Sequence, residues 1–281
     1  MIETQRQLLP GSHDIEVVRA APTGHVRAAL FDFDGTVSLI RAGWQDVMIP
    51  YFVEVLAATP QAEGIETLAA VARDFVDELT GKQTIYQAMR LAEEVTRRGG
   101  AAEEPIFYKR RYMELLWEHI HERFDDLVAG RTDPDTLRVP GTMAILTGLR
   151  ARGVTCYLAS GTDVDCVRRE CAALELTDCF DGGIGGALDD YKQFSKAMVI
   201  ERILADHDLH GPELVGFGDG FVEIENTVAA GGIAVGVATD ELHGAGVDAW
   251  KRNRLIGAGA HLIVPDFGEH ERLLAHLFGE S

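Results

Sequence analysis

The chain has 281 residues, 46% of them hydrophobic, and is long enough to bury a sizeable core in two domains or in one large domain with an insertion. Its 45 acidic and 26 basic residues give a formal net charge of -19, which repels nucleic acids and anionic membranes. We therefore expect no nucleic-acid or membrane partner, and an anionic ligand would need local cations or a bound metal.

Residues 1–14 do not have the basic, apolar and small-residue order of a signal peptide, and no apolar run reaches about 18 residues. This pattern predicts a cytoplasmic protein. The four cysteines lack the paired short spacings of a zinc site, so we expect reduced, buried thiols. The sequence is compatible with a homo-oligomer, and the basic run Lys251-Arg252-Asn253-Arg254 could pair with acids at a subunit contact.

The first half of the chain changes from extended to helical patterning. The stretches Ile15–Arg19 and Val26–Phe31 flank Ala-Pro-Thr-Gly, which predicts a hairpin leading from an N-terminal extension, residues 1–25, into the first core strand. Between Trp44 and Val128, apolar residues recur at spacings of three and four. This block predicts four helices and no strand.

After Pro140, helices and short apolar strands alternate. The predicted helices are Met143–Arg150, Val164–Leu174 and Ala197–Ala205, and the predicted strands are Thr155–Ala159, Leu214–Phe217, Ile233–Val237 and His261–Val264. Such strands, bounded by glycine or aspartate, are typical of parallel strands covered on both faces. The sequence therefore predicts an α/β fold with a parallel-sheet core, residues 26–40 and 136–281, and an all-helical domain, residues 41–135, inserted after the first core strand.

Two carboxylates lie where the first core strand is predicted to end. In Leu30-Phe31-Asp32-Phe33-Asp34-Gly35-Thr36 an apolar strand runs into Asp32 and Asp34, and the ligand site of an open α/β sheet lies at the carboxyl ends of its strands. Positions i and i+2 share one face of a strand, so both side chains could reach one reacting group. The other interpretation is a turn in which Asp34-Gly35 only closes the backbone.

A hydroxyl-rich turn and a lysine are candidates for binding an anion. Ser160-Gly161-Thr162 follows a predicted strand and precedes a helix, so its hydroxyls and backbone N–H groups can bind an anion. An N-cap supplied by Thr162 or Asp163 explains the same residues, and both roles can coexist. Lys196 stands at the start of a later helix, where a cation is unfavourable for the helix dipole unless an anion is near.

A further acidic group follows the strand Leu214–Phe217. Asp219 ends this strand, and Glu223 lies four residues later. Asp32, Asp34 and Asp219 at one sheet edge would repel one another unless they are protonated or bridged by a divalent cation such as Mg²⁺. We therefore expect a Mg²⁺ site. Glu223 is either part of this site or a solvated residue in the first turn of a helix.

The order DxDGT, SGT, Lys and GDGxxE resembles the four motifs of the haloacid dehalogenase superfamily of phosphotransferases. The 23-residue step from Lys196 to Asp219 is similar to that in its phosphoserine-phosphatase-like members. The resemblance extends from Val26 to Asp266 and implies a Rossmann-like core with the helical block as a cap between the first and second motifs. It favours a phosphatase or phosphomutase over a dehalogenase, because the superfamily's dehalogenases need no metal and lack an acid at the position of Asp34.

The resemblance implies a role for each motif residue. Asp32 is implied to be the nucleophile, and Asp34 the general acid and then the general base. The implied phosphate-binding residues are Ser160 and Lys196. Gly161 and Thr162, which follow Ser160 in the same turn, are candidate substrate-binding residues. The implied Mg²⁺ ligands are Asp32, Asp219, Glu223 and the backbone carbonyl of Asp34.

Two positions depart from the family pattern. The third motif lacks the common Lys-Pro, which leaves Lys192 as an alternative to Lys196. The last acid is Glu223 where the family has aspartate, so its ligation of the metal, direct or through water, stays open.

Substrate choice in helical-cap members depends on cap residues that close over the core. The polar turn Gly81-Lys82-Gln83-Thr84 is the candidate specificity loop, with Lys82, Gln83 and Thr84 as substrate-binding residues, although an ordinary helix start explains it equally well. Arg41, in the expected hinge, would meet the substrate or only a cap carboxylate.

The function implied is a magnesium-dependent phosphatase that hydrolyses a small phosphorylated metabolite, such as a sugar phosphate, through an aspartyl-phosphate. A phosphomutase is the first alternative, because it needs the same residues together with a cap that excludes water. A catalytically idle phosphate-binding scaffold on the same fold is the third hypothesis.

Overall fold

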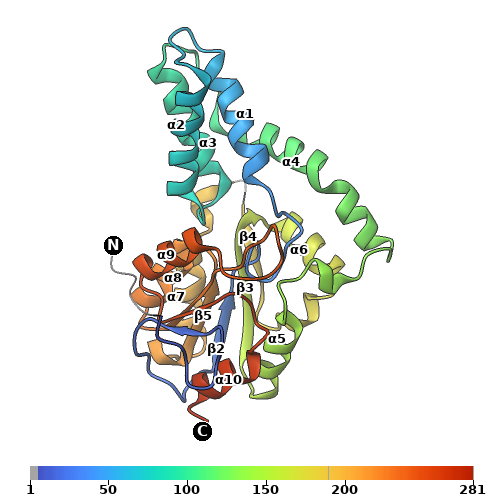
Figure 1. The fold of residues 1–281 in the computed structure, drawn as a ribbon, viewed down its shortest axis with the longest axis vertical. Coiled ribbons are helices and arrows are strands. Elements are labelled where there is room, and N and C mark those ends of the chain that lie inside the picture. The colour runs from blue at the N-terminus through green and yellow to red at the C-terminus, as the bar shows by residue number, and fades with distance from the viewer. Residues whose placement is uncertain (1–5, 189, 281) are drawn as a thin grey trace.

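The core of the fold is a seven-stranded sheet with one antiparallel strand at its edge. The computed structural model describes residues 6–188 and 190–280. The strands are β1 (Glu16–Val17), β2 (Ala28–Phe31), β3 (Thr155–Asp163), β4 (Gly183–Ala187), β5 (Leu214–Gly218), β6 (Ile233–Val237) and β7 (Leu262–Val264). Their order is β1-β7-β6-β5-β2-β3-β4, and only β1 pairs antiparallel. β2 therefore lies inside the sheet, between β5 and β3 (Figure 1).

Helices cover both faces of this sheet. Along β2, Ala29 and Phe31 belong to one hydrophobic cluster, whereas Ala28 and Leu30 belong to another on the opposite face. The first face is covered by α5 (Thr142–Ala151), α6 (Val164–Ala173) and α10 (His270–Phe278), and the second by α7 (Lys196–Asp206), α8 (Phe221–Ala229) and α9 (Ala249–Ala258). This arrangement explains why the core strands are continuous apolar runs.

An aromatic pair anchors the two central strands that lead into the candidate acids. Phe31 of β2 and Phe217 of β5 stack with ring centroids 4.4 Å apart, and neither ring is exposed. Burying one such side chain contributes about 1.5–3 kcal/mol. The carboxyl ends of β2 and β5 are thus held side by side, and this fixes where the segments carrying Asp32 and Asp219 begin.

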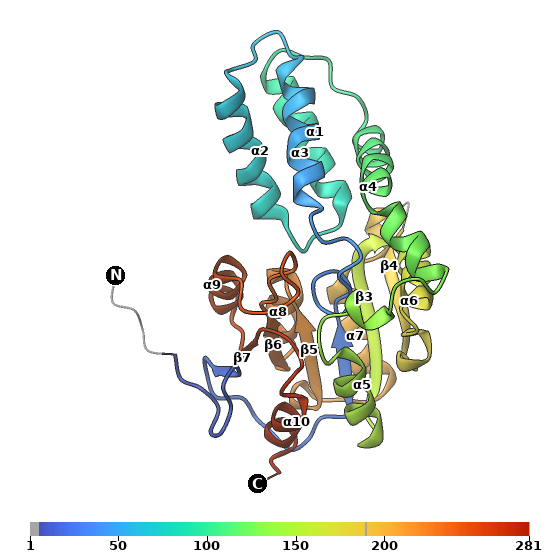
Figure 2. The same ribbon diagram turned by 45° about the vertical axis from the view of Figure 1, so that its right-hand side comes forward.

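Four helices between β2 and α5 form a cap above the carboxyl ends of the strands. They are α1 (Gln45–Ala57), α2 (Ile65–Leu79), α3 (Thr84–Arg97) and α4 (Pro105–Val128). Figures 1 and 2 show α1, α2 and α3 as a bundle over the sheet, with α4 running from this bundle down towards α6. The predicted α/β fold with an all-helical insertion is confirmed. Within residues 6–188 and 190–280, no helix is long and apolar enough to span a membrane.

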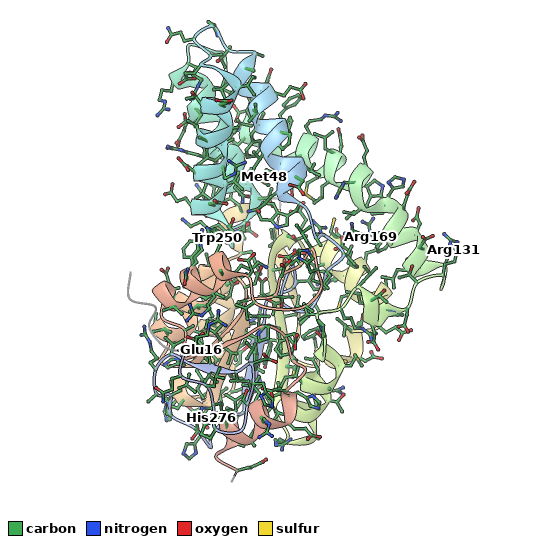
Figure 3. The ribbon with its side chains drawn as sticks, viewed as in Figure 1. Glu16, Met48, Arg131, Arg169, Trp250 and His276 are labelled. Atoms are coloured by element: carbon green, nitrogen blue, oxygen red, sulfur yellow. The ribbon has the colours of Figure 1, made fainter. Side chains whose placement is uncertain are left out.

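Arg254 of α9 fastens the core to the end of a cap helix. Its guanidinium donates hydrogen bonds to the backbone carbonyls of Asp77 and Glu78 at the C-terminus of α2, the latter at 2.9 Å. The last carbonyls of a helix have no partner within the helix, so an arginine from the core satisfies them. Figure 3 shows Met48 on α1 above the core and Trp250 on α9 below the cap, with the cap seated directly over the sheet.

The predicted N-terminal hairpin is wrong. β1 pairs with β7, at Glu16 with Ile263 and Val17 with Leu262, and does not pair with β2. β2 already has β3 and β5 as neighbours, so it offers no free edge to the preceding segment. The chain instead passes from the far edge of the sheet to its centre, and β7 takes up the edge strand.

The other predicted core strands are confirmed, with two differences. β3 continues four residues beyond the predicted end at Ala159 and reaches Asp163, so Ser160-Gly161-Thr162 belongs to the strand end itself. β4 has the sequence Gly-Ile-Gly-Gly-Ala, which is poor in the β-branched and aromatic residues that mark strands, so the pattern does not predict it.

Candidate active site

The motif residues meet at the carboxyl ends of the central strands. Asp32 directly follows β2, and its backbone N–H donates to the carbonyl of Phe217 in β5 at 2.9 Å. Asp219 directly follows β5, and Lys196 is the first residue of α7. Parallel strands bring their carboxyl ends to one edge of the sheet, so segments far apart in the sequence converge here.

Asp32 is buried against a lysine. The Lys196 Nζ lies 2.8 Å from Asp32 Oδ2, and both side chains are less than 8% exposed. Burial raises the pKa of Asp32, the neighbouring Glu223 raises it further, and Lys196 opposes them. Although burial lowers the pKa of Lys196, the carboxylates of Asp32 and Glu223 raise it overall, so the ammonium stays charged. Lys192, the alternative lysine, is exposed, so Lys196 is the lysine that reaches Asp32.

Glu223 is a buried part of the same cluster, so its interpretation as a solvated helix residue is wrong. Its Oε2 accepts a hydrogen bond from Lys196 at 2.8 Å, and its Oε1 accepts one from the backbone N–H of Gly220 at 2.8 Å. Gly218 makes room for this side chain, because a Cβ there would lie 1.9 Å from Glu223 Cγ. Burial raises the pKa of Glu223, but Lys196 and the hydrogen bonds lower it overall.

Three carboxylates have the spacing of a metal site. One oxygen each from Asp32, Asp219 and Glu223 lie within 4.8 Å of one another. Burial raises the pKa of Asp219 to about 6, against the opposing effect of Lys251. Buried carboxylates that repel one another are stabilised by a divalent cation, and Mg²⁺ prefers oxygen ligands. The donor set therefore fits Mg²⁺.

Asp34 has one bonded and one unbonded carboxylate oxygen. Thr162 Oγ1 donates to Asp34 Oδ2 at 2.8 Å, whereas Oδ1 is buried without a hydrogen-bond partner. Burial raises the pKa of Asp34 to about 6, with Arg41 lowering it and Glu170 raising it. A carboxyl group with this pKa exchanges its proton near neutral pH, as general acid and base catalysis requires.

Ser160 and Arg41 line the same pocket. Ser160 is 1% exposed, and its Oγ accepts a hydrogen bond from the backbone N–H of Thr162 at 3.0 Å. Arg41 donates to both carboxylate oxygens of Glu170 in α6, at 2.9 and 2.7 Å, and lies 3.6 Å from Asp34. The expected cap carboxylate is therefore wrong as the partner of Arg41, because Glu170 belongs to the core.

The predicted specificity loop touches the core mainly through its backbone. A Cβ at Gly161 would lie 2.9 Å from the carbonyl oxygen of Lys82, and a Cβ at Gly220 would lie 3.0 Å from Cα of Gly81. Lys82 itself is exposed, with its ammonium 5.9 Å from the ring centroid of Phe221. Both Lys82 and Thr84 line the pocket.

Gln83 does not line this pocket. Its Nε2 donates to the backbone carbonyls of Phe194, at 2.7 Å, and Tyr191, at 3.1 Å, both in the core. Gln83 is one of the three cap residues expected to bind substrate. It instead holds the cap against the core.

The pocket contains residues that no motif identifies. Lys251 of α9 binds Asp219 at 2.7 Å and also pairs with Glu241, so the acids that it meets lie inside the chain. Besides Arg41 and the backbone of Gly81, eight cap residues line the pocket and are here called the cap roof: Trp44, Met48, Thr80, Lys82, Thr84, Gln87, Tyr112 and Leu116. The pocket between roof and core is small, about 90 Å³, and partly open to solvent.

A sequence comparison assigns the family. A family model for haloacid dehalogenase-like hydrolases matches residues 29–221, more than half of the chain, and this span includes Asp32, Ser160, Lys196 and Asp219. The chain belongs to the haloacid dehalogenase-like hydrolase family. No curated protein matches the sequence significantly.

Solved structures agree with the family in fold. A protein from Haemophilus somnus 129PT, described as a predicted phosphoglycolate phosphatase, is 14% identical with a TM-score of 0.60, over 90% of this chain and 99% of its own. A phosphonoacetaldehyde hydrolase-like protein from Oleispira antarctica is 14% identical with a TM-score of 0.60, over 93% and 95%. A β-phosphoglucomutase from Clostridium difficile is 16% identical with a TM-score of 0.53, over 81% and 92%. The hydrolase core and its cap are thus both found in these structures.

Proposed function

We propose that this hydrolase is a magnesium-dependent phosphatase that acts on a small phosphorylated metabolite through an aspartyl-phosphate on Asp32. The observation that carries the proposal is the 2.8 Å pair of Asp32 and Lys196 in a pocket that Asp34 also lines. One group can attack phosphorus, one can neutralise the phosphoryl oxygens, and one can carry the proton of the leaving group. Family membership supports the same chemistry.

In the first step, an oxygen of Asp32 forms a bond to phosphorus while the bond from phosphorus to the ester oxygen breaks. Asp34 gives its proton to the departing oxygen, so the leaving group departs as a neutral alcohol. Lys196 and the Ser160 hydroxyl hold the phosphoryl oxygens during transfer. The hydrogen bond from Thr162 to Oδ2 fixes the orientation of the Asp34 carboxyl group.

In the second step, water attacks the phosphorus of the aspartyl-phosphate. Asp34, now ionised, accepts a proton from this water, and the bond from phosphorus to Asp32 breaks to release inorganic phosphate. Mg²⁺ held by Asp32, Asp219 and Glu223 would supply positive charge that keeps Asp32 ionised and offsets the charge of the phosphoryl oxygens. Asp34 would contribute its backbone carbonyl to the same ion.

The proposal is tested by phosphate release from sugar phosphates, phosphoglycolate, phosphoserine, nucleotides and p-nitrophenyl phosphate, with Mg²⁺ and with EDTA. We expect magnesium-dependent release that Asp32→Asn lowers by at least about 10³-fold. Asp178→Asn is the matched control, because Asp178 is exposed. Turnover that survives Asp32→Asn in a folded protein would refute the mechanism.

A phosphomutase is the second candidate, because cap side chains lie over the pocket and a mutase must keep water away from its phosphorylated enzyme. The same assay separates the two when products are followed by ³¹P NMR. Free phosphate without an isomeric ester supports the phosphatase, and an isomeric ester without free phosphate supports the mutase.

A further inference from the structure

A second cleft lies beside the active-site pocket, between cap helix α4 and core helix α6. Arg41 and Leu116 are both buried and line both spaces, so their side chains lie between the two. This space, here called the α4–α6 cleft, has a volume of about 480 Å³ and opens to solvent. Small-molecule sites in proteins commonly have volumes of about 300–1,000 Å³. The cleft is therefore large enough for a metabolite.

One wall of the α4–α6 cleft is an apolar face of the cap. Four side chains of α4, at spacings of seven, four and three residues, share one side of this helix and line the cleft: Ile106, Met113, Trp117 and Ile120. All but Ile120 are only partly buried against the hydrophobic core. Figure 1 shows α4 running down from the cap bundle towards α6, which forms the opposite wall. An apolar group can therefore pack on the α4 side of the cleft.

The α4–α6 cleft is positively charged, although the chain carries a formal net charge of -19. Its lining has four cations and two acids, whereas the lining of the active-site pocket has three cations and four acids. Both acids of the cleft already have partners, because Asp163 pairs with Lys109 and Glu114 pairs with Arg111 at 2.9 Å. The cleft is thus a local region that attracts anions on a chain that otherwise repels them.

Two cations of the cleft have no carboxylate partner. Arg110 of α4 and Arg169 of α6 form no ion pair with any residue that the structure describes. The Arg169 guanidinium lies over the rings of Trp117 and Phe124, 4.5 and 5.0 Å from their centroids, and so extends from the core towards the cap (Figure 3). A guanidinium stacked on aromatic rings keeps its N–H edge available for an oxyanion. The cleft therefore offers an anion one arginine from the cap and one from the core.

The start of α6 adds to the positive potential of the cleft. Asp163 precedes this helix, but its side chain does not cap it, and its carboxylate pairs with Lys109 instead. The N-terminus of a helix carries a partial positive charge, and Asp163 and Cys166 at this N-terminus both line the cleft. The helix dipole thus favours an anion independently of the two arginines.

We infer that the α4–α6 cleft is a second ligand site, which binds a small organic anion with an apolar body. Arg110 and Arg169 hold its carboxylate, sulfonate or phosphate group, and the apolar body packs on the exposed face of α4. The site does not depend on the proposed phosphatase chemistry, because neither Asp32 nor Lys196 lines the cleft. Since Arg110 belongs to the cap and Arg169 to the core, a bound anion joins the two and holds the cap in place.

The site is tested with two fluorescent probes that differ in charge. The first is 8-anilinonaphthalene-1-sulfonate, an aromatic anion, and the second is N-phenyl-1-naphthylamine, its uncharged counterpart. Both are titrated into the full chain in the presence of Mg²⁺. We expect the sulfonate to bind at least about 10-fold more tightly than the amine, because only the sulfonate meets the two guanidinium groups. Equal affinities of the two probes would overturn the assignment.

The two arginines are tested by substitution. Arg110→Met and Arg169→Met should each weaken binding of the sulfonate by about 10-fold and leave binding of the amine nearly unchanged. Arg73→Met in the cap and Arg168→Met in the core are the matched controls, because both side chains are exposed and lie outside the cleft. Arg169→Lys keeps the charge and should restore part of the affinity, which separates charge from lost packing on Trp117. Unchanged affinity for the sulfonate in both methionine variants would overturn the inference.

Two further measurements test the position of the site and its effect on the cap. Inorganic phosphate with Mg²⁺ should not displace the sulfonate, and displacement would place the probe in the active-site pocket and overturn the inference. Saturating sulfonate should slow proteolysis between the cap and the core several-fold, but not in Arg110→Met, because the bound anion no longer reaches the cap. Cleavage that is unchanged by bound sulfonate would refute the link from cap to core. Neither measurement depends on turnover, so both are independent of the proposed function.

Discussion

Thr162 Oγ1 donates a hydrogen bond to Asp34 Oδ2 at 2.8 Å, and the other oxygen of this carboxylate accepts no hydrogen bond and lies 3.6 Å from Arg41 Nε. The two residues are 128 positions apart in the chain and belong to different motifs. The hydroxyl favours the ionised carboxylate and so lowers the pKa of Asp34, while burial raises it to about 6. Thr162, at the end of β3, therefore lowers the pKa of Asp34, the residue proposed to protonate the leaving group.

A pH-dependent rate follows from this pair. Asp34 must be protonated to donate, so kcat/KM for an alkyl phosphate should fall about tenfold per pH unit above the pKa of about 6. Thr162→Val should move this limb to higher pH, because it removes a bond that lowers the pKa of Asp34. The check is a set of pH–rate profiles for both proteins. With p-nitrophenyl phosphate, whose leaving group needs no proton, the limb should be much weaker, and equal limbs for both esters would contradict the role.

The buried pair of Arg41 and Glu170 should control the same acid. The charge of Glu170 raises the pKa of Asp34 and that of Arg41 lowers it. Glu170→Gln should therefore shift the limb to lower pH. Glu170→Ala should cost about 3–5 kcal/mol of unfolding free energy, because it breaks a buried ion pair and leaves Arg41 with only the more distant Asp34 carboxylate. Denaturant unfolding and pH–rate profiles measure these effects, with Glu175→Gln as an exposed control. An unchanged limb of the pH–rate profile in Glu170→Gln would show that Glu170 does not affect the pKa of Asp34.

Mg²⁺ should stabilise the protein in a pH-dependent way. The pKa of Asp219 is raised to about 6, so protons compete with the metal below that pH. The rise in Tm on adding Mg²⁺ should be small at pH 5 and grow towards pH 7.5, where an ion at 100 times its Kd contributes about 2.7 kcal/mol. Lys251→Met should enlarge the gain at pH 7.5, because it removes an ammonium bound to Asp219. Lys192→Met is the control, and a gain independent of pH would argue against this metal site.

Arg254 should hold the cap down. It binds carbonyls at the end of α2 and also stacks over Phe221, 4.7 Å from the ring centroid. Arg254→Met should raise KM several-fold and speed proteolysis of the hinge, since the cap would open more often. Limited proteolysis with and without phosphate measures this, with Arg252→Met as the control because Arg252 binds Glu16 instead. Equal cleavage rates would show that other contacts close the cap.

The core of the site could be predicted from the sequence because each motif is a short pattern of neighbouring residues. Each acidic motif couples an apolar strand to a carboxylate just after it, so Asp32 and Asp219 could be placed at one sheet edge before any contact was known. Lys196 could be placed at a helix start, and the family resemblance assigned it to the same site. The helical insertion was predictable for the same reason, since periodicity is a local property. Burial of Glu223 was not, because it depends on Gly218 leaving room for the side chain.

The parts that escaped prediction depend on contacts between distant segments. Gln87 and Tyr112 look like ordinary helix residues until α3 and α4 are placed over the sheet. The basic run around Lys251 carries no sign of which acids it meets. The hairpin failed because the pairing partner of β1 lies almost at the other end of the chain, and no local turn pattern reports which sheet edge is free.

The close approach of Gly161 and Gly220 to the backbone of residues 81 and 82 has a consequence for how this hydrolase can change. These contacts between main-chain atoms limit how closely the cap can approach the core. This stop does not depend on the roof side chains. Any side chain at Gly161 would hold the cap ajar, whereas exchange of Gln87 or Tyr112 would leave the stop untouched. New substrates could thus be acquired through the roof while the depth of closure over Asp32 stays constant.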